Sequence, residues 1–155
     1  MSAIDHYLNR IIEQGGRHAK AEGSATIEAQ HLLLAIAAEP DPGAQDVLAE
    51  AGLDQAAIRA ALDREFEHSL NAAGVSSTAF DLTASPDQER RTTVGASAKL
   101  ALERGFAGVS RKKDLRPGHL LLGVLAAEVG TVPRALALAG INRAELAEQV
   151  RGRIS

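Results

Sequence analysis

Two histidines stand at the same place in two short apolar motifs, and their type and spacing are the first to suggest chemistry. His31 opens the run His-Leu-Leu-Leu-Ala-Ile, and His119 opens the run His-Leu-Leu-Leu-Gly-Val. A helical metal site needs a second His or a carboxylate four positions on, but those positions hold Ala35 and Gly123. We therefore expect each imidazole to hydrogen-bond the loop before its helix, and not to bind a metal or transfer protons.

Hydrolysis and nucleotide chemistry lack their usual signatures in this chain. There is no Gly-x-Ser-x-Gly elbow and no Cys, which argues against a poised nucleophile and a thiolate metal site. Glu145 and Glu148 stand beside Arg151, which indicates a solvated or ion-paired helix face. Residues 95–99 come nearest to a phosphate-binding loop, but they lack its second Gly and the hydroxyl after the Lys. The sequence predicts no catalytic residue, cofactor or metal, and a small hydrolase ranks third among the hypotheses.

One loop concentrates positive charge, and it contains Arg111, Lys112, Lys113 and Arg116. Blocks of like charge usually stay hydrated, which is the simplest interpretation. The alternative is contact with an acidic partner surface or, as a weaker option, with nucleic acid. The whole chain has 17 Lys and Arg against 20 Asp and Glu, a net charge of −3, and only 3% aromatic residues. This composition disfavours nucleic acid as a partner.

The two histidine motifs belong to a longer internal repeat. An offset of 88 positions carries His31 onto His119, and the same offset carries residues 48–54 onto residues 136–142. Two matches in one register predict a duplicated unit that was copied within the chain.

The repeat divides a single predicted domain, residues 1–155, into two halves. We place the first repeat at about 2–66, a linker at about 67–84 and the second repeat at about 85–154, since 155 residues are typical of one domain. The longest apolar run, 32–38, is far shorter than the roughly 18 residues that a membrane span requires. No signal peptide is evident, and we expect a cytoplasmic protein with no membrane partner.

Apolar residues at helical spacing predict four helices in each half, and so an all-α fold of eight helices in two four-helix repeats. The predicted ranges are 2–22, 29–39, 44–51 and 55–66 in the first half, and 86–104, 117–125, 133–139 and 143–154 in the second. Ser2, Asp54, Ser85 and Asn142 are the predicted N-caps, Pro86 is a predicted first helical residue, and Gly52, Gly105 and Gly140 are predicted helix stops.

The leucine triplets at 32–34 and 120–122 are predicted to be core, because three consecutive large apolar residues cover most of a helix circumference. In the fourth helix Ile58, Leu62 and Phe66 share one stripe. The pair at 15–16, two glycines inside a predicted helix, indicates either a close approach of another segment or a bend.

These motifs resemble the double-repeat N-terminal domain of Clp ATPases of the ClpA/ClpC type. In that family each repeat has a Gly, a short loop, Thr-Glu-His-(Ile/Leu)-Leu-Leu-Gly-Leu and later Leu-x-x-x-Gly-(Val/Leu). The matching stretches are 29–36 after Gly23 and 117–124 after Gly105. The resemblance implies an all-α domain of eight helices with pseudo-twofold symmetry between the halves. It also implies a non-catalytic domain that receives substrates and adaptor proteins.

In the ClpC branch, the Glu of Thr-Glu-His helps to bind phosphoarginine on substrates. The matching positions here are Gln30 and Gly118, preceded by Ala29 and Pro117 in place of Thr. A neutral amide or a missing side chain cannot make the charge-assisted paired contact that a guanidinium group favours. We therefore expect weak phosphoarginine binding or none.

The resemblance further implies a groove where the first helices of the two repeats approach one another, which the family uses for adaptors and certain cyclic-peptide antibiotics. Alignment of the repeats places six residues near that groove: Ile12, Gly16, Pro86, Arg91, Val94 and Gly95.

The leading hypothesis is a non-catalytic protein- or peptide-binding module of the Clp protease system. Its expected partners are Clp substrates, adaptors or a Clp ATPase, and also cyclic-peptide antibiotics, and it would act as a stand-alone regulator or decoy if no ATPase is attached. The alternative is a stress-linked regulator that contacts nucleic acid through the basic loop at 111–116.

Overall fold

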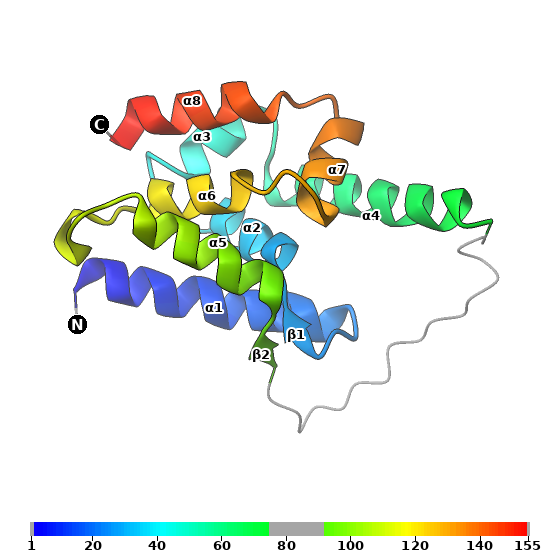
Figure 1. Cartoon of the computed structure of the whole chain (residues 1–155), viewed down its shortest axis with the longest axis horizontal. Coiled ribbons are helices and arrows are strands. Elements are labelled where there is room, and N and C mark those ends of the chain that lie inside the picture. The colour runs from blue at the N-terminus through cyan, green and yellow to red at the C-terminus, as the bar shows by residue number, and fades with distance from the viewer. Residues whose placement is uncertain (1, 75–91, 155) are drawn as a thin grey trace.

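The computed structural model describes residues 2–74 and 92–154, which form eight α-helices and two short strands (Figure 1). In chain order they are α1 (Ala3–Ala21), β1 (Thr26–Ile27), α2 (Ala29–Ala38), α3 (Gln45–Glu50), α4 (Gln55–Ala72), β2 (Thr93–Val94), α5 (Ala96–Ala107), the 3₁₀ turn η2 (Lys112–Asp114), α6 (Pro117–Leu125), α7 (Thr131–Leu138) and α8 (Arg143–Ile154). The predicted all-α fold of eight helices is confirmed, and the two strands are an addition to it.

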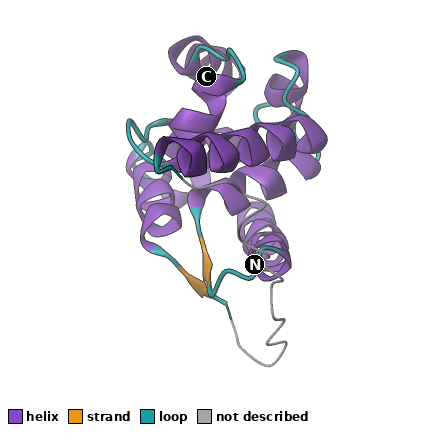
Figure 2. Cartoon of the chain, turned by 90° about the vertical axis from the view of Figure 1, so that its right-hand side faces the viewer, coloured by secondary structure: helices purple, strands orange, loops and turns teal. Residues whose placement is uncertain are grey.

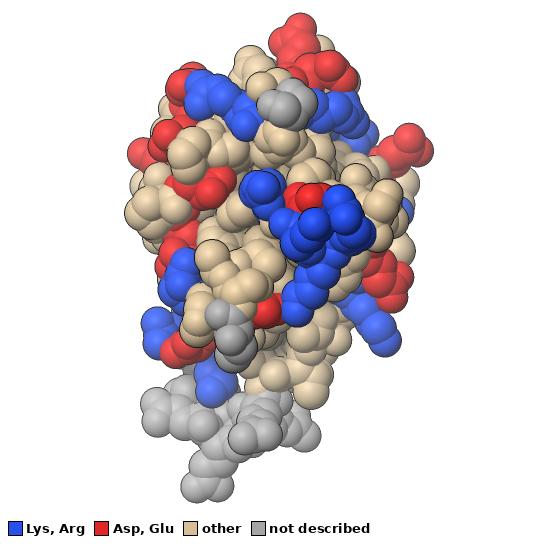
Figure 3. Space-filling view, turned by 90° about the vertical axis from the view of Figure 1, so that its left-hand side faces the viewer, with Lys and Arg blue, Asp and Glu red and all other residues tan. Residues whose placement is uncertain are grey.

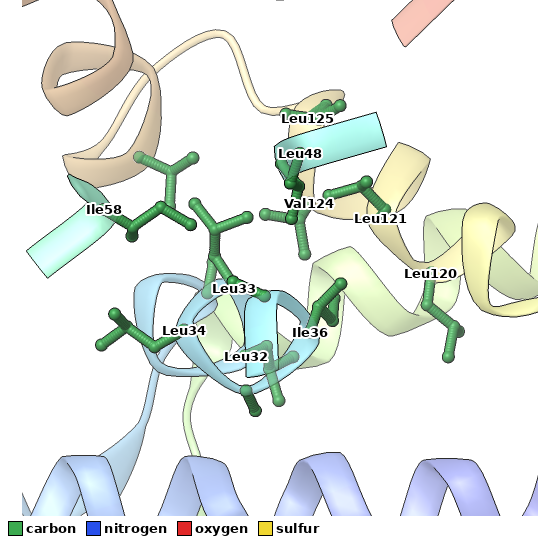
Figure 4. Close-up of a cluster of buried hydrophobic side chains, with 14 of the residues drawn as sticks. Leu32, Leu33, Leu34, Ile36, Leu48, Ile58, Leu120, Leu121, Val124 and Leu125 are labelled. Carbon is green, nitrogen blue, oxygen red and sulfur yellow. The ribbon is translucent and has the colours of Figure 1, made fainter. Parts of the chain in front are cut away.

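The two triplet helices, α2 and α6, lie at the centre of the fold and contact each other. Figure 4 shows the leucines of α2 pointing in three directions, with Leu32 toward α1, Leu33 away from α1 and Leu34 to the side. All three are buried, as are Leu120 and Leu121, whereas Leu122 is half-buried. The prediction that the triplets form the core is confirmed for these five leucines.

The contacts of one half are mirrored in the other. The pair α1–α2 has its counterpart in α5–α6, and α2–α4 has its counterpart in α6–α8. Helices also cross between the halves, because α4 packs against α7 and α8 packs against α3. This pairing of contacts supports the predicted duplication, whose boundaries stay a prediction.

The local signals for helix ends are confirmed at most positions. Each predicted N-cap at Ser2, Asp54 and Asn142 accepts a hydrogen bond from the backbone N–H three residues on, at 2.7–3.3 Å. Gly52 and Gly140 have φ of 77° and 75°. This left-handed conformation is disfavoured for residues that carry a Cβ, and it ends α3 and α7.

The helix predicted over 86–104 is wrong at both ends. The corresponding helix in the structure, α5, begins only after β2 and continues past Gly105. The predicted N-cap Ser85 and the predicted first helical residue Pro86 lie outside the described residues. The β-branched run Thr92-Thr93-Val94 favours an extended chain. In the structure β2 pairs in parallel with β1, and the Gly95 N–H donates to the Ile27 carbonyl at 2.8 Å (Figure 2).

The fourth helix is longer than predicted. It continues to Ala72, so residues 67–72 of the predicted linker are helical, and the predicted docking residues Phe80 and Leu82 lie outside the described residues. Ile58 and Leu62 are buried as their stripe predicts, but Phe66 is 51% exposed. At this level of α4 the buried position is the adjacent Glu65, whose carboxylate accepts a hydrogen bond from Arg134 of α7.

Glycines allow α5 and α6 to approach closely. Gly105 and Gly123 are both buried, and a Cβ at position 105 would lie 3.0 Å from the His119 carbonyl oxygen. A Cβ at position 123 would overlap the Ala101 carbonyl oxygen and lie 2.8 Å from the Gly105 nitrogen. The two helices are thus in backbone contact at this crossing.

Candidate peptide-binding site

The two motif histidines lie in the first turns of α2 and α6, where each accepts a hydrogen bond from the backbone of the N-cap residue. The Glu28 N–H donates to His31 Nδ1 at 2.8 Å, and the Arg116 N–H donates to His119 Nδ1 at 2.9 Å. His31 is buried, and its Nε2 lies 2.6 Å from a Glu22 carboxylate oxygen. The prediction that each imidazole hydrogen-bonds the preceding loop is confirmed, which gives both residues a structural role.

A third histidine, His18, lies against a guanidinium group. Its Nδ1 accepts a hydrogen bond from the Arg59 guanidinium group of α4 at 2.9 Å. Burial lowers the pKa of His18, and the charge of Arg59 lowers it further. A histidine whose pKa is lowered by folding stabilises the fold above its unfolded value of about 6.5, and this stabilisation is lost as the pH falls through the folded value.

We therefore expect the free energy of unfolding to decrease between roughly pH 7.5 and pH 5.5, as His18 takes up a proton beside Arg59. Urea unfolding of the chain and of His18→Gln at both pH values measures this, and the variant should lose part of the pH dependence. An equal pH dependence in the two proteins would contradict the assignment to His18.

The basic loop is held against the start of α1. Lys112 Nζ lies 2.6 Å from an Asp5 carboxylate oxygen, and Arg111 Nε lies 3.5 Å from Asp114. The hydrogen bond from Lys112 holds the pKa of Asp5 well below its usual range, together with hydrogen bonds from Ser2. Two of the four cations of the loop are thus paired with carboxylates of the chain, which differs from the expectation of a fully hydrated loop.

The residues assigned to the predicted groove have different surroundings, and the groove stays a prediction. Gly16 is buried, and a Cβ there would lie 3.1 Å from the Thr92 hydroxyl, so the glycine pair permits a close approach of the chain. Gly95 is also buried and packs against the Glu28 side chain. Ile12 is half-buried and Val94 is exposed. The other two predicted groove residues, Pro86 and Arg91, lie outside the described residues.

The two positions matched to the phosphoarginine Glu have different surroundings. Gln30 is half-buried and opens onto a cleft. Gly118 is buried beneath α8, where a Cβ would overlap Ile154 and lie 2.9 Å from the Gly43 carbonyl oxygen. A longer side chain at position 118 would therefore have to displace the end of α8.

Gln30 belongs to a cleft of about 330 Å³ that both halves build, which we call the inter-repeat cleft. Its walls are the start of α2, one face of α5 and the segment from the end of α6 into α7. Leu100 and Val129 line it and are 44% and 85% exposed. Apolar side chains held at the rim of a concave surface are typical of binding sites for other molecules.

Fixed charges surround these apolar side chains. Arg134 lines the cleft, and its Nε donates to the buried Glu65 carboxylate of α4 at 3.0 Å. Glu28 lies at the start of α2, where burial opposes ionisation but hydrogen bonds from Ser97 and Thr26 outweigh it and lower the Glu28 pKa. The Ser97 hydroxyl donates to Glu28 at 2.7 Å and accepts from the Ala29 N–H. The cleft therefore has walls that are already ordered without a ligand.

Sequence patterns did not identify the apolar members of this cleft. Leu100 and Val129 are far apart in the chain, and they meet only because α5 packs against α6. The one available signal was Leu100, since it falls outside the buried stripe of Ala98, Ala101 and Gly105 on α5. A large apolar residue off the core face of a helix indicates a contact surface.

The family of the chain follows from its sequence. A family model described as the Clp repeat (R) N-terminal domain matches residues 4–104, more than half of the chain. The chain belongs to this family. The resemblance stated above is confirmed, although the match ends before the second leucine triplet.

Solved structures of other proteins have the same fold. The N-terminal domain of the Clp protease-associated chaperone ClpD from Arabidopsis thaliana is 22% identical, with a TM-score of 0.65, and the match covers 96% of this chain and 92% of that one. A structure from a study of a malarial protein secretion system is 19% identical with a TM-score of 0.63, covering 96% and 91%. No curated protein sequence matches the chain. Among the described residues, no helix of this Clp N-domain has the length and apolar character of a membrane span.

Proposed function

We propose that this Clp N-domain binds protein or peptide segments in the inter-repeat cleft and performs no chemistry on them. The observation that carries the proposal is the cleft itself, which is lined by exposed Leu100 and Val129, by neutral Gln30 and by the hydrogen-bonded side chains of Glu28 and Arg134. Family membership supports partners from the Clp system, namely substrates, adaptors or a Clp ATPase. In this proposal the chain acts as a regulator that competes with other Clp N-domains for ligands, cyclic-peptide antibiotics included.

Aspartate substitutions at the rim test the proposal. The probe is reduced and carboxymethylated lactalbumin, a permanently unfolded protein, labelled with a fluorophore and titrated with the chain while anisotropy is measured. Leu100→Asp and Val129→Asp should each weaken binding about tenfold or more, since each replaces apolar contact by a charge that must be desolvated. Leu138→Asp is the matched control, because Leu138 is similarly exposed at 39% but does not line the cleft. Equal affinities for all of these proteins would refute the cleft as the binding site.

Phosphoarginine should bind weakly or not at all. Gln30 offers no charge for the guanidinium group, and position 118 has no room even for a Cβ. We expect isothermal titration calorimetry with free phosphoarginine to show no saturable binding in the micromolar range. We also expect Gln30→Glu to improve the affinity about tenfold, through a hydrogen bond to a charged group. Micromolar, site-specific binding by the unaltered chain would show this expectation to be wrong.

The nucleic acid alternative gains little support from the basic loop. Lys112 and Arg111 already pair with Asp5 and Asp114, so two of the four cations of the loop have carboxylate partners. To bind duplex DNA, the loop would have to break these ion pairs. If the pairs stayed intact, the carboxylates of Asp5 and Asp114 would repel the phosphates.

A further inference from the structure

A second cavity, separate from the inter-repeat cleft, lies at the start of α1. It has a volume of about 680 Å³, and its walls are the first two turns of α1, the Pro40–Asp41 loop and the segment from η2 to Pro117. We call it the Tyr7 cavity, after the one tyrosine of the chain, which lines it.

The hydroxyl group of Tyr7 lacks a partner. The side chain is only 4% exposed, and its oxygen is buried with no hydrogen bond to any residue that the structure describes. Burial raises the pKa of Tyr7, and Asp41 and Glu39 raise it further, so the hydroxyl keeps its proton and is a donor. Buried donors are almost always satisfied in native proteins. Because Tyr7 lines the cavity, an acceptor atom that enters there would satisfy this hydroxyl.

The cavity is also lined by cationic side chains, and some of them have no ion-pair partner among the described residues. Arg10 and Lys112 are paired with Glu39 and Asp5, at 3.0 Å and 2.6 Å. Lys113 and Arg116 line the cavity too, and within residues 2–74 and 92–154 neither of them has an ion pair. Arg116 instead donates to the carbonyl oxygens of Lys113 and Leu115, which orders the loop. On the face that contains this loop, Lys and Arg side chains gather around a small acidic patch (Figure 3).

A single carboxylate fits these groups better than a polyanion does. One neutral donor and two unpaired cations match one or two negative charges and their acceptor oxygens. Asp5 and Asp41 also line the cavity, and they would repel the continuous negative charge of a nucleic acid backbone. The occupant must therefore be short and anionic, and an acidic side chain on a protein segment has this chemistry.

We propose that the Tyr7 cavity binds a Glu or Asp side chain of a protein ligand, whose carboxylate accepts a hydrogen bond from Tyr7 and pairs with Lys113 and Arg116. This inference rests on the proposed function, because it gives the protein ligand a second anchoring point outside the inter-repeat cleft.

Two peptide probes and a hydroxyl deletion test the inference. The probes are a fluorescein-labelled hexapeptide of alternating Leu and Glu, and its twin in which every Glu is Gln. The unaltered chain should bind the Glu peptide about tenfold or more tightly than the Gln peptide. Tyr7→Phe should lose most of this preference while its thermal stability stays the same or rises, since the substitution removes a buried donor that the free protein leaves unsatisfied.

Charge variants separate the cavity from general electrostatics. Lys113→Gln should weaken binding of the Glu peptide about threefold or more, whereas Lys20→Gln removes the same charge near the far end of α1 and should leave it unchanged. Equal affinity for the two peptides, an unaltered preference in Tyr7→Phe, or equal effects of the two lysine variants would each overturn the inference. The inference would also be overturned if duplex DNA displaced the labelled Glu peptide at a lower concentration than the unlabelled Glu peptide does.

Failure of this inference and failure of the proposed function give different results. If the Glu preference is absent but Leu100→Asp still weakens binding of the unfolded protein, only the second anchoring point is lost. If neither variant matters, the binding function itself fails.

Discussion

Replacing Gly123 by Ala should destabilise the fold by about 3 kcal/mol or more, at the upper end of what overpacking costs. A Cβ at this position would overlap the Ala101 carbonyl oxygen and crowd the Gly105 nitrogen, and both are backbone atoms of α5 that no side-chain rotation can move away. Helix α6 would have to separate from α5, which removes contacts along the whole crossing. Urea unfolding followed by circular dichroism measures the loss.

Gly152→Ala is the matched control for this change. Gly152 lies within α8, and nothing lies within 4 Å of a Cβ added there. The same substitution should therefore stabilise the chain by up to about 1 kcal/mol, since Ala loses less backbone entropy in a helix. A Gly123→Ala variant as stable as Gly152→Ala would show that α5 and α6 are not in backbone contact.

Replacing Leu33 by Ala should cost about 2–5 kcal/mol, because the change removes three buried carbons and leaves a cavity at the centre of the fold. Leu33 is 1% exposed and extends from α2 away from α1, into the space that Ile58 and Val124 border (Figure 4). These neighbours come from both halves and are themselves fixed by packing, so they can close the gap only in part. Denaturant unfolding again gives the free energy.

Leu138→Ala serves as the control for Leu33→Ala. Leu138 is exposed on α7, and the same loss of volume there should cost less than about 1 kcal/mol. Comparable losses at the two positions would mean that the leucine triplet is not the core that the structure describes.

Features set by neighbouring residues were predictable from the sequence. The caps at Ser2 and Asp54, the stop at Gly52 and the buried leucines all depend on residues within one or two helical turns. The histidine of each motif was also interpreted correctly, because Nδ1 needs only the N–H three residues before it.

Features that join distant residues were not predictable. The helix predicted from residue 86 fails because the extended run before α5 gains a partner in β1, about which nothing in 86–104 gives information. The first turn of α5 is capped by Glu28 from the other half, whose carboxylate accepts from the Ser97 N–H at 3.2 Å. The inter-repeat cleft and the unpaired hydroxyl of Tyr7 likewise exist only after packing.

The packing of helices across the two halves has a consequence for how the molecule unfolds. Because α4 packs against α7 and α8 packs against α3, each half buries part of the apolar surface of the other. Unfolding of one half would therefore expose apolar surface of the half that remains. The molecule should accordingly denature in a single all-or-none transition, without a half-folded species. A ligand that contacts both halves then stabilises every helix against unfolding, including helices that it does not contact.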